Sequence, residues 1–290
     1  MQRNYNNIKD DEVRFIGQVG KKKRRAYLPW LLAGLLFIIF FVALYFVKSS
    51  YRFDSIPIHA INDNAYCESG LKKNEATEFL KSVSDNAPSS IEVFCDTFNN
   101  VPLRFFCPRN CNVELRVGKQ EISDSIVLIC EAAGIRADNG EIVGTFIING
   151  NVLAKSRSKQ GYCAIIDNQI YIGSEDATPY VEKALEGNGS FFRQYSLIHN
   201  FKIQKTNQNV KALRKALCKF RGECVVVETQ TAVSMTEFTD ILHEMDIAEA
   251  IYLNGAETWG WFTTENQIVE FGIKEKDVPQ NINYIVWTKR

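Results

Sequence analysis

The hydrophobic and polar positions of this chain form two contrasting patterns. From Tyr27 to Val47 the residues are apolar without interruption by any charge. About 20 such residues in a helix span the ~30 Å hydrocarbon core of a bilayer. Beyond residue 60, short runs of apolar residues with strand-like alternation are interleaved with a few stretches of helical spacing. The pattern therefore predicts one membrane-spanning helix at 27–47, followed by a folded part that mixes strands and helices.

Most of the strands are expected in hairpins. Asn149-Gly150, the strongest two-residue hairpin signal, separates two β-rich runs. Asp167-Asn168 and Glu265-Asn266 stand between similar pairs of runs. The hairpins are expected at 145–148 with 151–154, 162–166 with 169–172, and 259–264 with 267–271. Single strands are expected at 223–228, 248–253 and 283–288.

Helices are expected where capping residues precede helical spacing. Thr178-Pro179 begins one helix, which ends at Gly187. Ser234 and Glu237 form a capping box that begins a second. Two more are expected, one capped by Asn74 and one at 209–217. These elements predict an α+β fold, with a mixed, largely antiparallel sheet and flanking helices, preceded by the transmembrane helix.

The predicted organisation has five parts. They are a cytoplasmic tail at 1–26, the transmembrane helix at 27–47, a stalk at 48–60, a possible N-terminal subdomain at 61–130 and a main domain at 131–290. Five basic residues at 21–25 precede the apolar run, which places the N-terminus in the cytoplasm and the C-terminal domain in the periplasm or outside the cell. A cleaved signal peptide is the alternative, but the run is longer than the roughly 7–15 residues of such a peptide and no small-residue cleavage site follows.

All 8 cysteines follow the apolar run. An even number of cysteines in an exported domain is typical of disulfides, so most are predicted to be bonded, with 107–111 and 218–224 as the shortest candidate pairs. The spacings within these pairs are not the C-x2-C of zinc sites, and the 3 histidines are scattered. We therefore predict no metal.

The charge balance argues against one class of partner. The 290 residues contain 34 Lys+Arg and 34 Asp+Glu, a net charge of zero. A nucleic-acid binder normally has a basic excess. The motifs of nucleotide-binding and common hydrolytic enzymes, G-x-x-x-x-G-K-[ST], G-x-S-x-G and H-E-x-x-H, are absent as well. Neither a nucleic acid nor a cofactor is therefore expected.

The second half of the chain has a characteristic order of segments. They are GTFIINGNVLAKS (144–156), GYCAIIDNQIYIG (161–173), FFRQYSLIHNFKIQK (191–205), FRGECVVVETQ (220–230), SMTEFTDILHEMDI (234–247) and AEAIYLNGAETWGWF (248–262). This order resembles the phosphodiester glycosidase family, whose domains are of the N-acetylglucosamine-1-phosphodiester α-N-acetylglucosaminidase type. The chain looks like a divergent member, in which the resemblance covers roughly the last half.

The chain departs from the family at two motifs. The family's Leu-Asp-Gly-Gly-Gly-Ser loop is Leu253-Asn254-Gly255-Ala256-Glu257-Thr258 here, so asparagine stands in place of the aspartate. The family's Asn-Gly-Gly-Phe-Phe stretch is reduced to 143–146, which keeps Gly144. The arginine at the head of the family's strand is matched by Arg221. The resemblance therefore implies the fold more firmly than the activity.

The candidate site follows from these positions. Arg221, helped by Lys219, is the candidate phosphate binder, because a guanidinium donates two parallel hydrogen bonds. Glu257 is the candidate acid–base catalyst. The candidate sugar-binding residues are Asn254, Gly255, Tyr252, Trp259 and Gly144. Arg221 and the 254–257 loop meet in one pocket if their strands are neighbours in the family's arrangement.

Together with the predicted membrane anchor, the resemblance implies an exported hydrolase that acts on a glycosyl phosphodiester or a related envelope glycan. Its expected partners are the membrane and a phosphorylated glycan or sugar phosphodiester. The alternative is a non-catalytic glycan-binding or envelope scaffold protein with a degenerate site, which the asparagine at 254 favours. Each residue also has a plainer interpretation: Arg221 pairs with Glu223, Glu257 is a solvated charge, and Trp259 packs with Trp261 on one strand face.

Overall fold

Strands dominate this computed structural model, which describes residues 87–156, 159–187, 189–206, 208–255, 257–265, 267–274 and 278–290. All belong to one compact unit, Asn62–Arg290. Strands contain 51% and helices 9% of the described residues, and the helices number two. The predicted α+β class is therefore wrong, because the described part of the chain is mostly β.

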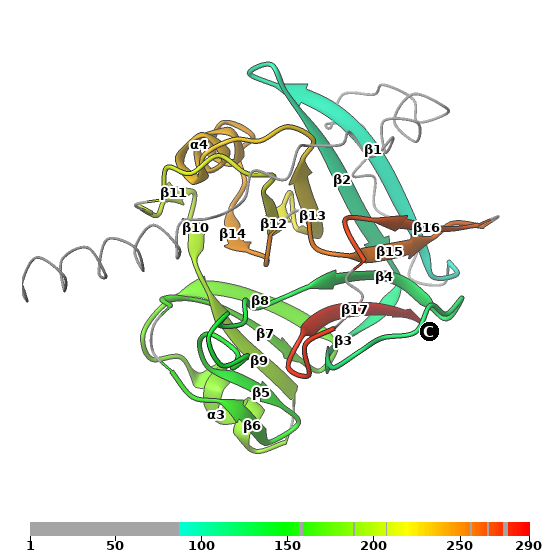
Figure 1. The fold of residues 1–290 in the computed structure, drawn as a ribbon, viewed down its shortest axis with the longest axis vertical. Helices are drawn as coiled ribbons and strands as arrows, with labels where there is room; N and C mark the ends of the chain where they lie inside the picture. The colour runs from blue at the N-terminus through cyan, green and yellow to red at the C-terminus, as the bar shows by residue number, and fades with distance from the viewer. Residues whose placement is uncertain are drawn as a thin grey trace, which may run out of the picture. The chain divides into compact units, whose positions relative to one another are not determined.

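The described residues form three sheets, and every strand pairing within them is antiparallel (Figure 1). The first sheet has the order β1 (Ser90–Phe98), β2 (Val101–Arg109), β13 (Glu223–Thr229), β12 (Lys215–Phe220), β14 (Glu249–Tyr252), β10 (Ser196–His199) and β11 (Lys202–Ile203). The second has the order β16 (Ile268–Phe271), β15 (Gly260–Thr263), β4 (Ile126–Glu131), β17 (Asn283–Lys289) and β3 (Cys111–Val117). The third has the order β6 (Asn151–Ala154), β5 (Phe146–Ile148), β9 (Gly189–Gln194), β7 (Gly161–Ile166) and β8 (Gln169–Ser174).

The segment predicted as a helix at 209–217 accounts for part of the error in fold class. Its last three residues, 215–217, begin β12, a central strand with apolar side chains on both faces. Leu217 belongs to one hydrophobic cluster, whereas Ala216 and Cys218 belong to another on the opposite face. A strand that is buried on both faces lacks the alternation that distinguishes it from a helix. The helix expected after Asn74 lies outside the described residues.

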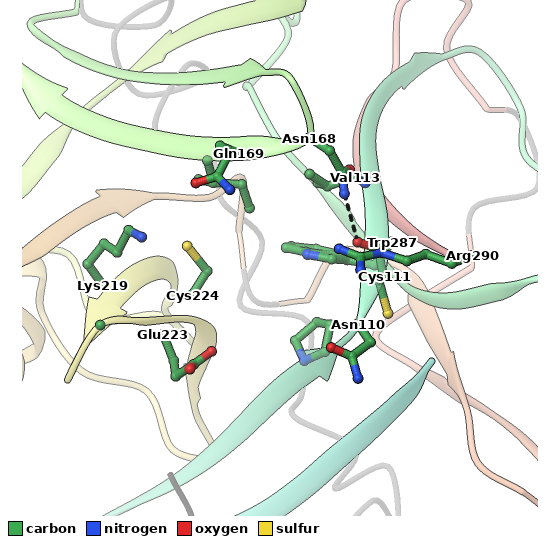
Figure 2. A pocket seen from close by; sticks show the side chains of 13 residues that line it. Asn110, Cys111, Val113, Asn168, Gln169, Lys219, Glu223, Cys224, Trp287 and Arg290 are labelled. Carbon is green, nitrogen blue, oxygen red and sulfur yellow. Dashed lines mark hydrogen bonds between the residues drawn. The ribbon is translucent and has the colours of Figure 1, made fainter. Parts of the chain in front are cut away.

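The predicted hairpins are confirmed, and their tips have the backbone that two-residue turns require. Asn149 and Gly150 have φ of 45° and 83°, and Asp167 and Asn168 have 51° and 61°. Two consecutive positive φ values define the type I′ turn, whose twist matches that of the strands. The side chain of Asn168 also attaches its hairpin tip to β3, because its Oδ1 accepts from the backbone N–H of Val113 at 2.7 Å. Its Nδ2 donates to the carbonyl oxygen of Cys111 at 3.1 Å (Figure 2).

The two helices begin at the predicted caps. In α3 (Pro179–Leu185) the Thr178 side chain accepts from the backbone N–H of Tyr180. In α4 (Met235–Glu244) the capping box is complete, with Ser234 Oγ accepting from the N–H of Glu237 at 3.1 Å and the Glu237 carboxylate accepting from the N–H of Ser234 at 2.7 Å. The apolar face of α4 packs on the first sheet, and α3 packs on the third.

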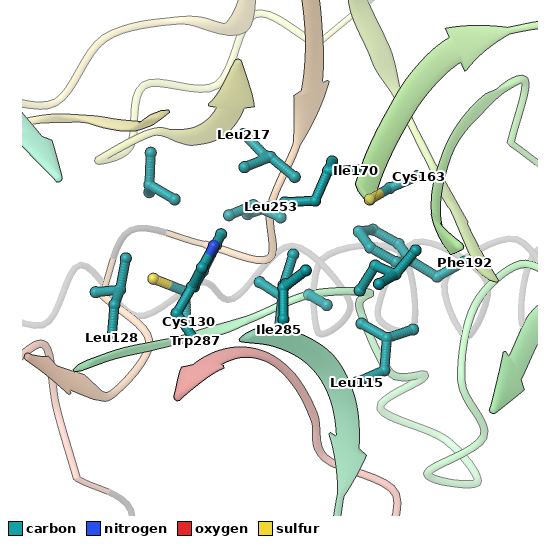
Figure 3. Packing of buried hydrophobic residues seen from close by; sticks show 14 of the residues in the cluster. Leu115, Leu128, Cys130, Cys163, Ile170, Phe192, Leu217, Leu253, Ile285 and Trp287 are labelled. Carbon is teal, nitrogen blue, oxygen red and sulfur yellow. The ribbon is translucent and has the colours of Figure 1, made fainter. Parts of the chain in front are cut away.

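The main core lies where the three sheets meet (Figure 3). Leu217 of β12, Ile285 of β17 and Phe192 of β9 all belong to this cluster and are fully buried. Since each sheet contributes one apolar face, the sheets cannot separate without exposing this surface to water. Strands of residues 90–131 share these sheets with later strands, as β2 pairs with β13, and β4 pairs with β15 and β17.

Among the residues that the structure describes, no helix is long and apolar enough to cross a membrane. The predicted localisation, a single-pass membrane protein with its C-terminal domain in the periplasm or outside the cell, is corrected on this finding. The expected tail, spanning helix and stalk at 1–26, 27–47 and 48–60 lie outside the described residues.

Candidate functional site

A buried carboxylate and an amide meet where β4 and β14 end. Asn254, two residues beyond β14, donates from Nδ2 to Glu131 Oε2 at 2.7 Å. Its backbone N–H donates to the carbonyl oxygen of Ala132 at 2.9 Å. Glu131 is the last residue of β4 and is only 7% exposed. Asn254 thus has a fixed position beside an acid that the sequence did not single out.

Gly134 and the last residue of β9, Gln194, lie close to the Asn254 side chain. A Cβ placed on Gly134 would lie 3.4 Å from Asn254 Oδ1 and 4.0 Å from Gln194 Nε2, so this glycine leaves room between two amides. The backbone before Gly134 is held by Asn283, which accepts from the N–H of Ala133 at 2.7 Å and donates to its carbonyl oxygen at 2.9 Å. One carboxylate and two amides therefore converge on a rigid backbone.

Tyr252, a predicted sugar contact, lies on the same strand end beside a buried arginine. The Arg214 guanidinium donates from Nη1 to the Tyr252 hydroxyl at 3.4 Å and from Nε to the carbonyl oxygen of Val233 at 3.2 Å. Arg214 is 5% exposed. Arg214 directly precedes β12, whose first residue is Lys215. The carbonyl oxygen of Lys215 accepts from the N–H of Leu253, and this hydrogen bond brings Arg214 to the end of β14. The hydrophobic pattern of the sequence gives no sign that Arg214 is buried, because it is one of several basic residues in this segment.

The loop after Asn254 is closed by a threonine. Thr258 Oγ1 donates to the carbonyl oxygens of Asn254 at 2.9 Å and Gly255 at 2.5 Å. Glu257 is exposed, and its carbonyl oxygen accepts from the N–H of Ile273 at 2.8 Å. Gly255 and Glu257 therefore follow Asn254 directly in one loop. The hydrogen bond from Ile273 joins this loop to the segment after β16.

Arg221 and Lys219 lie at the other end of β12. In the antiparallel register Ala216 is opposite Tyr252, whereas Lys219 is opposite Glu249 at the start of β14. Arg221 follows β12 in the tight turn to β13, with φ of 51°. At about 3.3 Å per residue, the turn is well over 10 Å from the end of β14. Arg221 and the 254–257 loop therefore do not share one pocket.

The remaining two predicted contacts have packing roles. Gly144 has φ of 95°, and a Cβ there would lie 2.9 Å from the carbonyl oxygen of Arg193. Trp259 is 7% exposed, its ring lies 4.8 Å from that of Trp261, and its indole N–H donates to Glu270 at 2.7 Å. The Lys274 ammonium covers the Trp259 ring at 4.5 Å. Neighbouring protein groups thus already contact this ring.

A buried ionic cluster that the sequence did not reveal spans β2, β12 and β13. Arg104 Nε donates to Glu228 Oε1 at 2.7 Å, and Lys215 Nζ lies 3.4 Å from Glu228 Oε2. All three side chains are at most 4% exposed. Burial by itself raises the pKa of the Glu228 carboxyl, but the charges of Arg104 and Lys215 hold it below its ordinary value.

The cysteines differ from the prediction. Cys95 is disulfide-bonded, but six others are free: Cys107, Cys111, Cys130, Cys163, Cys218 and Cys224. In each expected pair, 107–111 and 218–224, one member packs in the cluster beneath α4 and the other against the main core. Cys218 and Cys224 leave opposite faces of the first sheet, whereas Cys107 and Cys111 belong to different sheets, β2 of the first and β3 of the second. The members of neither pair are bonded to each other. The prediction that most cysteines are bonded is therefore wrong for the described residues.

Burial also makes these thiols poor nucleophiles. It raises the pKa of Cys107 and Cys130 to about 12, and that of Cys111 to about 11. Since the thiolate is the reactive form, these cysteines are inert at neutral pH. In the part of the chain that the structure describes, no group of three or more His, Cys, Asp or Glu side chains is placed to hold a metal ion.

Comparison with known proteins finds distant similarity of structure alone. No protein family matches the sequence, and no curated protein does. The catalytic domain of zebrafish N-acetylglucosamine-1-phosphodiester α-N-acetylglucosaminidase, auto-inhibited by its pro-peptide, is similar with a TM-score of 0.49 and 13% identity, over 71% of this chain and 85% of that one. A hypothetical protein from Synechocystis is similar with a TM-score of 0.48 and 12% identity, over 70% of this chain and 64% of that one. These values describe a distant structural relationship and carry no argument about activity.

Proposed function

We propose that this protein hydrolyses a glycosyl phosphodiester at the ends of β4 and β14, with Glu131 as the general base. The observation that carries the proposal is the Glu131–Asn254 hydrogen bond of 2.7 Å beside Gly134. The bond orients the carboxylate, and Gly134 places no side chain between the Asn254 and Gln194 amides. A catalytic base must lie within hydrogen-bond reach of the proton that it accepts, so such fixed geometry is the first requirement.

One carboxylate is sufficient for this chemistry. Water attacks the anomeric carbon and gives its proton to Glu131, while the bond from that carbon to the phosphate oxygen breaks and its electron pair leaves with the phosphate. Ordinary glycosidases need a second carboxyl group to protonate an alkoxide leaving group. A phosphate monoester is stable as an anion, so it leaves without a proton. The asparagine at 254 therefore does not by itself abolish the reaction.

The other groups at this end of the sheet bind the substrate in our proposal. The guanidinium of Arg214 positions Tyr252, because its Nη1 donates to the Tyr252 hydroxyl while its Nε and Nη2 donate to the carbonyl oxygens of Val233 and Val210. Asn254, Gly255 and Tyr252 contact the sugar, as the sequence predicts, together with Gln194. Glu257 is the carboxylate of the 254–257 loop and is tested separately below. This assignment leaves Arg221, at the far end of β12, outside the catalytic site.

Turnover of a panel of sugar-1-phosphate diesters tests the proposal. Glu131→Gln keeps the size and the acceptor oxygen of the side chain but removes the base, so kcat should fall by roughly 10²–10⁴. Glu257→Gln is the matched control and should keep most of the activity. Arg214→Gln, which releases the Tyr252 hydroxyl, should lower turnover of the diesters, whereas Arg221→Ala should not. Activity that survives Glu131→Gln but is lost in Glu257→Gln contradicts the role of Glu131 and restores the sequence-based assignment.

Non-catalytic glycan binding is the second candidate, and the register of β12 favours it. The two cations expected on the phosphate, Arg221 and Lys219, lie at the far end of β12 from Asn254. If the chain binds glycans but turns over none of the diesters, and Glu131→Gln leaves that binding unchanged, the protein is a binding module and the catalytic proposal fails.

A further inference from the structure

A small cavity lies at the end of β12 that is remote from Asn254. Its volume is about 210 Å³, and it is lined by residues of the β12–β13 hairpin, the tip of the β7–β8 hairpin, the β2–β3 connection and the end of β17 with Arg290 (Figure 2). Sites for drug-sized ligands are larger, about 300–1,000 Å³. Any ligand of this cavity is therefore small.

Two cations line this cavity, and Figure 2 shows them on opposite sides of it. Lys219 belongs to β12, and Arg290 directly follows β17. Within the described part of the chain, none of the ion pairs involves either side chain. An anion bound in the cavity would supply the counter-charge that the described residues do not.

Two cysteine thiols in the walls show that both positive charges act on the cavity. Burial raises the pKa of Cys224, and the charge of Lys219 opposes this rise. Burial likewise raises the pKa of Cys111 to about 11, and the charge of Arg290 is among the effects that oppose it. Both thiols line the cavity. Because the interaction between charges falls with distance, the two cations lie beside these walls.

Trp287 adds a neutral hydrogen-bond donor. It is 4% exposed, belongs to the main core and lines the cavity. Among the described residues, no group accepts from its indole N–H. This N–H is not sealed from solvent, whereas that of Trp261 is. The indole of Trp287 is therefore available to donate to a ligand in the cavity.

Glu223 contributes the one side-chain carboxylate among the described residues of the lining. Its Oε2 lies 3.1 Å from Nη1 of Arg109, a buried arginine that also bonds Glu92 at 3.1 Å. In the β12–β13 register Glu223 is opposite Phe220 and not opposite Lys219. The lining thus combines two cations with a carboxylate that is already paired, and this balance favours a negatively charged ligand.

We propose that this cavity binds a small tetrahedral oxyanion, either free phosphate or the phosphate group of a small monoester. The Arg290 guanidinium donates two parallel hydrogen bonds to such a group, and the Lys219 ammonium and the Trp287 indole N–H donate from other directions. A tetrahedral oxyanion has oxygen atoms for all of these donors, whereas a carboxylate has two. The site lies at the opposite end of β12 from the proposed catalytic one, and it does not depend on hydrolysis.

Titration of the full chain with phosphate at constant ionic strength, followed by NMR of the Trp287 indole N–H, tests the site. Loss of one indole resonance in Trp287→Phe identifies it. Saturable movement of this resonance is expected at millimolar phosphate. Lys219→Met and Arg290→Gln should each weaken binding about tenfold, the effect of one lost charge-assisted hydrogen bond. Two variants should bind as the wild type does: Lys119→Met, which removes an exposed lysine outside the cavity, and Lys219→Arg, which keeps the charge.

Sulfate and methyl phosphate, titrated in the same way, distinguish the two sources of the oxyanion. Tighter binding of methyl phosphate than of phosphate indicates a monoester, the reverse order indicates the free ion, and both support the proposal. A Trp287 resonance that saturates with none of the three anions overturns it, as does full affinity in either Lys219→Met or Arg290→Gln. An equal loss of affinity in Lys119→Met and Lys219→Met overturns it as well, because binding then follows the overall charge of the protein.

Glu131→Gln separates this site from the catalytic one. It should leave the phosphate affinity at Trp287 unchanged, even where it abolishes turnover. Failure of the proposed hydrolysis therefore leaves the anion site standing. Loss of the phosphate response in Glu131→Gln overturns the proposal, because it places the bound anion at the other end of β12.

Discussion

The buried cluster of Arg104, Glu228 and Lys215 predicts that two substitutions in one site have opposite consequences. Glu228→Gln leaves two buried cations without a counter-charge and should lower the free energy of unfolding by about 3–5 kcal/mol. Lys215→Met leaves Arg104 and Glu228 as a neutral pair. It should change stability by less than about 1 kcal/mol or raise it, because an apolar side chain of similar volume often replaces a buried ion without loss.

The geometry explains this asymmetry. Arg104 donates to Glu228 from two nitrogen atoms, one at 2.7 Å. Lys215 Nζ, in contrast, lies 3.4 Å from Glu228 Oε2 and makes no hydrogen bond. Its ammonium lost its hydration on burial and gained only the ion pair and the face of the Phe271 ring at 4.6 Å. The arginine therefore stabilises the carboxylate more than the lysine does.

Urea unfolding of the wild type and both variants measures the difference. At about 2–4 °C per kcal/mol for a domain of this size, Glu228→Gln should also lower Tm by about 6–20 °C. A loss in Lys215→Met as large as that in Glu228→Gln refutes the reasoning, because it shows that the ammonium contributes as much as the guanidinium.

The same cluster predicts a pH dependence. The pKa of Glu228 is lower in the folded state than its ordinary value of 4.5, so the unfolded state binds more protons as the pH falls below that value. The contribution of Glu228 is therefore present above pH 4.5 and is lost as the pH falls through the folded-state pKa. Glu228→Gln should lack this component, and an unchanged acid slope in that variant contradicts the sign.

Three other predictions concern packing, capping and thiols. Gly144→Ala should lower the free energy of unfolding by about 1–3 kcal/mol, because the new Cβ meets the backbone of Arg193 and φ is 95°. Gly140→Ala, where φ is 68° and no atom lies near the new Cβ, should lower it less. Equal losses of the two variants in thermal unfolding would exclude the clash at Gly144. Ser234→Ala should cost about 1 kcal/mol through the lost cap of α4, and no change in urea unfolding would contradict the capping role. Thiol titration should find at least six free groups in the denatured, unreduced protein but few reactive ones in the folded protein, and fewer than six on denaturation would show that the cysteines are bonded.

Local sequence signals determined the hairpins and helix starts of this protein. Asn149-Gly150 and Asp167-Asn168 tolerate positive φ, so these turns form wherever the flanking residues favour strands. Ser234 and Glu237 satisfy each other's backbone N–H groups whatever the rest of the chain does. Such features depend on a few adjacent residues, and this is why the sequence alone was sufficient for them.

Tertiary structure decided the identity of β12 and the composition of the site. Lys215 is stable in a strand because Glu228 faces it from β13, and no local pattern announces a partner at that distance. The antiparallel register of β12 and β14 then separates Arg221 from Asn254 and brings Arg214 beside Tyr252. Glu131 meets Asn254 across 123 residues of sequence. Pairing between strands that are distant in sequence depends on which sheet faces are buried against each other. The order of hydrophobic and polar residues along the chain does not specify which faces these are.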